Sequence, residues 1–165
     1  MAQRFATAFP FRGGGGRITR MNLYAITIDI QAPPERVWAV MSDAERWPEW
    51  TPSVTRIRRE EPGELRVGSR VWIHQPGFPP ALWRVTEIEP GRRFTWITGS
   101  AVMRATARHS LEPAAGGCRA TLSVEYSGLF GWLLARMTAG VNDRYLSMEA
   151  NGLKARCEGE AAAQG

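Results

Sequence analysis

The sequence predicts a single α+β domain, in which a curved antiparallel sheet of about seven strands surrounds a long C-terminal helix, with two short helices after the first strand. Successive segments alternate apolar and polar side chains, and turn sequences with proline and glycine separate them. A helical stripe of apolar residues follows the last of these segments. The length of 165 residues, of which 44% are hydrophobic and 22% charged, suits one domain with one core.

The first predicted strand and the two short helices lie within the first fifty residues. Residues 24–30 alternate between apolar and polar side chains, as a half-buried strand does. Two prolines and an acidic residue in 32–35 are typical of a helix start. Asp43 can cap a second short helix, which Pro48 ends.

Six further segments predict an antiparallel meander, because short turns connect consecutive strands. They cover residues 54–60, 69–74, 81–89, 93–99, 102–111 and 118–127. In the last two segments the apolar side chains share one face, and Arg104, Arg108, Arg119 and Glu125 lie on the other. One face of this sheet is therefore expected to meet water and the other to be covered.

A long C-terminal helix is the predicted cover. After Gly128, apolar residues recur at steps of four, three, four, four and three. They are Phe130, Leu134, Met137, Val141, Tyr145 and Met148. We expect the helix to run to about residue 157, with Gly140 as a place where it could bend.

Residues 1–20 differ from the rest of the chain, since they contain four arginines, no acidic residue and no apolar periodicity. The sequence predicts a flexible basic N-terminal arm over 1–20 and one domain over 21–165. An acid-free, arginine-rich start resembles an organellar transit peptide, whereas Met21 favours a later true start. A chain that begins at Met21 is expected to be as stable as the full chain.

Composition and motifs argue against several functions. The net charge is +5, but beyond residue 20 the chain carries 17 basic and 16 acidic groups, so nucleic acid is not an expected partner. Cys118 and Cys157 have no further cysteine or histidine at metal-ligand spacing, so we expect thiols and a location in the reducing cytoplasm. The sequence predicts neither a metal nor another cofactor. The most apolar run, 129–135, is too short to span a membrane. The oligomeric state is not predicted.

Two segments, APPERVW at 32–38 and DAERWPEW at 43–50, together with the helix start at Gly128 and Leu129, resemble the START-like helix-grip superfamily (SRPBCC; START/Bet v 1-like). More narrowly, they resemble its polyketide cyclase/dehydrase-like group of bacterial proteins, over about residues 22–158. The resemblance implies a cavity between helix and sheet that holds a lipid, a polyketide or another apolar small molecule. Members include enzymes, carriers and proteins with no known reaction, so the family alone does not set an activity.

Aromatic residues and the apolar helix stripe are the predicted walls of this cavity. Alanines at 105, 107 and 120 on the covered face leave room opposite the helix. The predicted ligand-binding residues are Trp50, Trp83, Phe94, Trp96, Phe130, Leu134, Met137, Val141 and Met148. The alternative is that the tryptophans only fill the core.

His109 is the one residue titrating near neutral pH on the apolar face of its segment, and Tyr126 and Tyr145 could reach the same space. These three are the candidate catalytic residues of a cyclase or dehydratase that works by general acid/base catalysis. The alternative is a buried histidine hydrogen-bonded to a tyrosine. The sequence thus favours a small-molecule binder, with the enzyme and a partner-binding module like chaperone co-factors of this fold as rivals.

Overall fold

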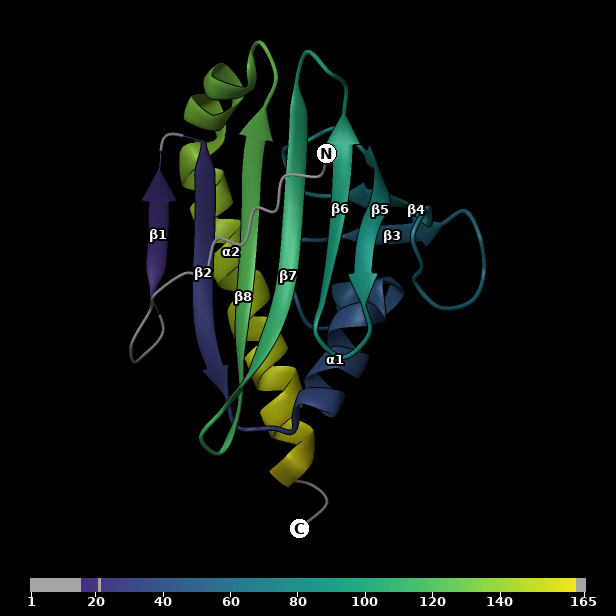
Figure 1. The fold of residues 1–165 in the computed structure, drawn as a ribbon, viewed down its shortest axis with the longest axis vertical. Helices are drawn as coiled ribbons and strands as arrows, with labels where there is room; N and C mark the ends of the chain where they lie inside the picture. Colours follow the sequence, from purple (N-terminus) through teal and green to yellow (C-terminus); the bar gives the residue numbers. More distant parts are fainter. Residues whose placement is uncertain (1–15, 21, 163–165) are drawn as a thin grey trace, which may run out of the picture.

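The computed structural model describes residues 16–20 and 22–162. The strands are β1 (Arg17–Arg20), β2 (Leu23–Ile30), β3 (Arg56–Arg59), β4 (Arg70–His74), β5 (Ala81–Glu89), β6 (Arg93–Gly99), β7 (Arg104–Ala114) and β8 (Gly117–Ser127). The helices are α1 (Pro34–Ser42), the short 3₁₀ helix η1 (Ala44–Glu49) and the long α2 (Gly131–Ala162). The fold class is the predicted one, with a curved antiparallel sheet around a long C-terminal helix (Figure 1).

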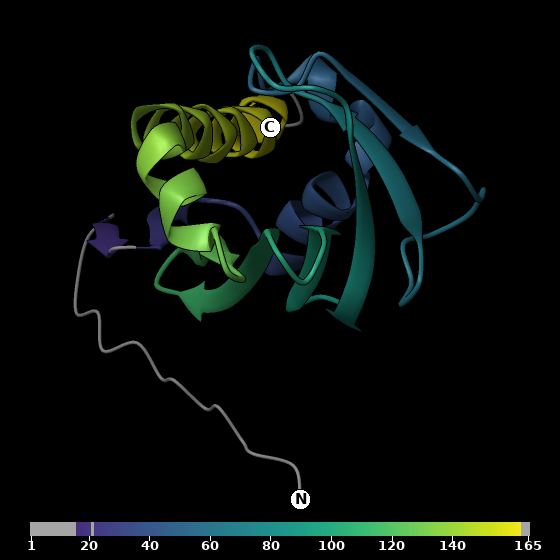
Figure 2. The same ribbon diagram turned by 90° about the horizontal axis from the view of Figure 1, so that it is seen from above.

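All neighbouring strands are antiparallel, in the order β1-β2-β8-β7-β6-β5-β4-β3. Seen from above, the sheet curves round and α2 lies across its concave side (Figure 2). α2 packs on β2 and β8, and α1 packs beside it. The concave side of β4 to β7 therefore faces a different side of α2 from the one that packs on β2 and β8. We call this side the flank of α2.

Strand β1 was not predicted, and it corrects the expectation of a flexible arm for residues 16–20. The amide of Gly16 donates to the carbonyl of Thr27 (3.2 Å), and the amide of Thr27 donates back (2.9 Å). Arg17 Nη2 also donates to Ser147 Oγ on α2 at 2.7 Å. Without β1, the edge of β2 would present unpaired backbone groups, and a segment that pairs with them requires no apolar periodicity. The rest of the predicted arm, residues 1–15, lies outside the described residues.

The register confirms which side chains share a face in β7 and β8. His109 pairs with Leu122, and both are buried on the concave face. On the convex face Arg108 and Glu125 form an ion pair of 2.7 Å. Arg119 meets Asp29 of β2 at 2.7 Å, and this hydrogen bond holds the pKa of the Asp29 carboxyl below its usual value.

The segment after β2 departs in detail from the prediction. α1 begins with Pro34, but η1 is a 3₁₀ helix and the Asp43 side chain makes no capping hydrogen bond. The fixing contact comes from Trp47 instead, whose indole Nε1 donates to the carbonyl of Met41 at 3.1 Å. Trp47 is almost fully buried, so η1 is held by its own tryptophan inserted into the core.

Helix α2 extends five residues past the predicted end and buries a different face from the one predicted. Its buried side chains beyond the first turn are Ala135, Thr138, Asn142, Tyr145, Leu146, Glu149, Ala150, Leu153 and Cys157. Of the predicted stripe, only Tyr145 is buried; Leu134 and Met148 are half-buried, and Phe130, Met137 and Val141 are exposed. The helices of the described chain include none with the length and hydropathy needed to cross a membrane.

Candidate functional site

The most distinctive feature of the interior is a buried ionisable pair. Nε2 of His109, on β7, lies 3.2 Å from Oε1 of Glu149, on α2, forty residues further along the chain. Their exposed fractions are only 4% and 8%. A buried carboxyl group without a hydrogen-bond partner is costly, so the pair fixes both side chains and ties helix to sheet.

Aromatic rings enclose the histidine. Phe94 stacks on it with ring centroids 4.5 Å apart and planes inclined by 10°. Trp47 and Trp96 lie against it with centroids 5.3 and 5.7 Å away. Trp83 packs in turn on Trp96 at 5.7 Å. Three of the predicted ligand walls, Trp83, Phe94 and Trp96, therefore pack on one another or on the histidine within the core.

The second ring nitrogen of His109, Nδ1, differs from Nε2 in its surroundings. Nδ1 is buried, and no group of the described chain hydrogen-bonds to it. When Nε2–H donates to the Glu149 carboxylate, Nδ1 carries the lone pair and accepts. This arrangement suits a general base, but a substrate hydroxyl would reach Nδ1 only after the aromatic rings move apart.

Tyr126 belongs to a separate hydrogen-bonded set. Its hydroxyl donates to Asn142 Oδ1 at 2.9 Å, and Asn142 Nδ2 donates to Thr138 Oγ1 at 2.9 Å. The chain of bonds ends on α2 itself, since Thr138 Oγ1 donates to the carbonyl of Leu134 at 2.8 Å. The structure thus gives Tyr126 an asparagine partner and gives His109 a glutamate.

Tyr145 reaches across the concave side. Its hydroxyl donates to the carbonyl of Pro76, in the loop between β4 and β5, and its ring meets Phe78 edge-on with centroids 6.1 Å apart. Since α2 rests on β2 and β8, this contact connects the two margins of the curved sheet. Of the three predicted catalytic residues, each has a different partner, and none bonds to another.

Sequence reasoning missed three polar residues of α2: Thr138, Asn142 and Glu149. They recur at steps of four and seven, which places them on one helix face. That spacing was the available signal. The apolar stripe beside these residues was predicted to be the covering face instead, because polar residues are rarely buried unless the fold supplies hydrogen-bond partners.

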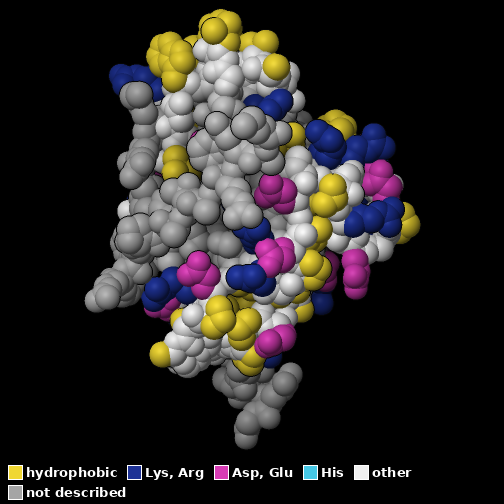
Figure 3. Space-filling view, viewed as in Figure 1, with side chains coloured by type: hydrophobic (Ala, Val, Ile, Leu, Met, Phe, Trp, Pro, Cys, Tyr) yellow, Lys and Arg dark blue, Asp and Glu magenta, His cyan; other side chains and the backbone are white. Residues whose placement is uncertain are grey.

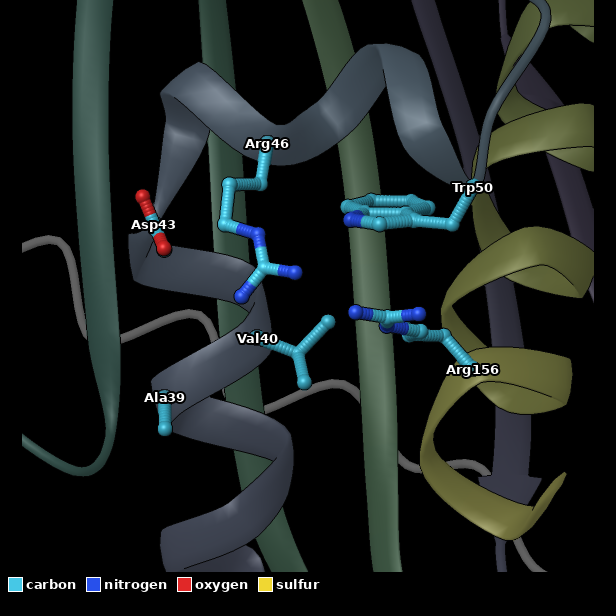
Figure 4. Close-up of a pocket in the computed structure, with 6 residues that line it drawn as sticks. All are labelled: Ala39, Val40, Asp43, Arg46, Trp50 and Arg156. Carbon is cyan, nitrogen blue, oxygen red and sulfur yellow. The ribbon is translucent and has the colours of Figure 1, made fainter. Parts of the chain in front are cut away.

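Two surface hollows lie beside α1. One, of about 240 Å³, is lined by Ala39, Val40, Asp43, Arg46, Trp50 and Arg156 (Figure 4). The other, of about 510 Å³, is lined by Trp38, Ala39, Ser42, Asp43, Arg59, Gly63, Glu64, Leu65, Ile88 and Pro90. The predicted wall residue Trp50 therefore borders the first hollow, between η1 and α2.

Charges around the first hollow are matched. Glu49 accepts two bonds from Arg46, both 2.9 Å, and lies 3.4 Å from Arg156 Nη2. The bonds from Arg46 hold the pKa of Glu49 below its usual value. Within the residues that the structure describes, no three side chains of the His, Cys, Asp or Glu type gather where they could hold a metal ion.

The family described as "Polyketide cyclase / dehydrase and lipid transport" matches residues 23–158. The chain belongs to this family. Membership of the polyketide cyclase/dehydrase family confirms two predictions: the relationship to the SRPBCC superfamily and the helix-grip fold.

Several individual proteins resemble this family member at low sequence identity. An uncharacterized protein of Mycobacterium tuberculosis is 23% identical over 122 residues, which cover 72% of this chain and 67% of that protein. A hypothetical protein of Helicobacter pylori has the same fold, with a TM-score of 0.69, 16% identity, and coverage of 95% of this chain and 99% of that one. The di-domain ARO/CYC StfQ from the steffimycin biosynthetic pathway matches with a TM-score of 0.64 at 13% identity, over 86% of this chain and 53% of StfQ.

Proposed function

We propose that the protein binds an apolar or aromatic small molecule, polyketide-like or lipid-like, between α2 and the concave face of the sheet. Membership of the polyketide cyclase/dehydrase family supports a small-molecule ligand. We also propose that the protein works in the cytoplasm, because Cys118 and Cys157 are both thiols and a reducing compartment keeps cysteines in this state.

One observation carries the proposal: the flank of α2 that looks over the concave side is apolar and partly open. Tyr145 marks this flank, because its ring spans to the β4–β5 loop. Val141 lies one turn before Tyr145, and Met148 lies three residues after it, so both share the flank. Val141 is exposed and Met148 half-buried. Apolar side chains left open beside a concave sheet are what an apolar ligand would cover.

The test is a binding titration that follows tryptophan fluorescence, with oleate and a hydroxylated anthraquinone as probes. We expect saturable binding of at least one probe. At a hundred times its dissociation constant, that probe raises the free energy of unfolding by about 2.7 kcal/mol. Absence of binding by both would count against the proposal.

Val141→Asp is the diagnostic variant, because it places a charge on the proposed wall. We expect it to weaken probe binding by at least about tenfold. Val67→Asp is the matched control: Val67 is also exposed, at 60%, but lies in the connection before β4. Equal loss in both variants would place the ligand elsewhere.

The second candidate function is general acid/base catalysis on a polyketide-like substrate. Two observations favour it: Nδ1 of His109 has no hydrogen-bond partner among the described residues, and Glu149 bonds to Nε2. In that case His109→Ala abolishes turnover, typically by about a hundredfold or more, while probe binding persists. If His109 only packs in the core, the wild type shows no turnover of such a substrate, and His109→Ala lowers only the free energy of unfolding.

A further inference from the structure

One end of the molecule exposes a group of large apolar side chains. They come from the loop between β6 and β7, from the turn that leads into α2, and from the first turn of α2 itself. We call them the apolar tip: Val102, Met103, Leu129, Phe130, Trp132 and Leu133. Leu129 is 71% exposed and Trp132 55% exposed. Figure 3 shows hydrophobic side chains gathered at the end where β8 passes into α2.

The two loops form one surface. The amide of Phe130 donates to the carbonyl of Val102 at 3.1 Å. At Gly128 the backbones approach so closely that an added Cβ would lie 2.6 Å from the same carbonyl oxygen. The apolar tip is therefore a single patch held by backbone contacts, and its side chains do not pack into the core.

The charge around the apolar tip has one sign. Residues 99–111 and 126–142 contain no Asp or Glu. Arg104 and Arg136 are exposed, and neither has an ion-pair partner in the part of the chain that the structure describes. Arg136 also lies one helical turn after Trp132, so a cation and an aromatic ring share one outward row.

We propose that the apolar tip docks the protein on the surface of an anionic lipid membrane. Leucine, phenylalanine and tryptophan at a helix start, beside arginines and without acids, match the boundary between acyl chains and negatively charged headgroups. Tryptophan prefers this boundary because its ring is apolar and its N–H is polar. The docking goes beyond ligand binding and does not depend on the Val141 flank.

The test is co-sedimentation of the full chain with vesicles of phosphatidylcholine, with and without phosphatidylglycerol. We expect binding to the anionic vesicles that weakens as salt is added, and weaker binding to the neutral ones. The paired change Leu129→Asp with Trp132→Asp should abolish it. The paired change Arg104→Gln with Arg136→Gln should lower affinity for anionic vesicles on the order of 25-fold and leave neutral vesicles unaffected.

Two controls separate the possible outcomes. Val67→Asp alters an exposed valine away from the tip and should bind vesicles normally, and so should Val141→Asp, which impairs only the proposed ligand site. Each variant should melt as the wild type does, since the changed side chains are exposed. Lack of vesicle binding by the wild type would overturn the proposal. So would a dimer in sedimentation velocity that the Leu129 and Trp132 changes dissociate, because a second copy would then cover the tip.

Discussion

Gly152 of α2 lies directly against the main-chain carbonyl of Trp50. A Cβ added at Gly152 would be 2.1 Å from that oxygen and 3.1 Å from the indole ring. The contact brings α2 against the residue that follows η1, and it sets the distance between α2 and η1 beside the hollow that Trp50 and Arg156 border. Only glycine permits this approach.

The first prediction concerns this contact. Gly152→Ala should lower the free energy of unfolding by about 1–3 kcal/mol, because backbone or helix must shift to admit the methyl group. Gly140→Ala is the control on the same helix, since its added Cβ meets nothing within 4 Å. It should raise stability by up to about 1 kcal/mol through helix propensity. Urea denaturation of both variants measures the difference, and a neutral Gly152→Ala would contradict the close approach.

The second prediction concerns the buried pair. Glu149→Ala removes the hydrogen-bond partner of His109 Nε2 and should cost about 1–3 kcal/mol of stability. Glu125→Ala breaks the exposed ion pair with Arg108 and should cost no more than about 1 kcal/mol. Thermal and urea unfolding compare the two. Similar small losses would mean that the pair contributes nothing beyond a surface ion pair.

The sequence predicted the elements well where local chemistry decides them. Turns such as Glu61-Pro62-Gly63 and Glu89-Pro90-Gly91 separate the strands, and Gly63 and Gly91 adopt the positive φ that such turns use. Strands β5 and β6 have the predicted ends. These features depend on neighbours in the chain, which the sequence displays directly.

The candidate site was harder to predict because its partners come from distant elements. Nothing near Glu149 in the sequence indicates that a histidine on β7 will meet it, so Glu149 was not among the predicted site residues. The apolar stripe was predicted to cover the sheet and line a cavity, although Met137 is exposed. Strand β1 was missed because an edge strand pairs through backbone groups, whatever side chains it carries.

The third prediction concerns acid. Glu158 accepts from the backbone amide of Gln31 and from Lys154 Nζ, both at 2.8 Å, and these bonds lower its pKa. A lowered pKa in the folded state adds stability above the unfolded value of about 4.3, and that stability disappears as pH falls through the folded value. Glu158→Gln should therefore be less stable than wild type near pH 6, with the gap closing toward about pH 3. A gap that stayed constant with pH would contradict the charge-based account.

The last prediction concerns β1. A chain that begins at Met21 lacks this strand, so the β2 edge loses the Gly16–Thr27 pairing, and α2 loses the bond from Arg17 to Ser147. We expect its free energy of unfolding to fall by at least about 1 kcal/mol, and its exposed edge to promote aggregation. A chain that begins at Gly16 keeps β1 and is the control, and Arg17→Ala isolates the contact with α2. Equal stability of the Met21 and Gly16 chains would restore the original expectation that residues 1–20 are dispensable.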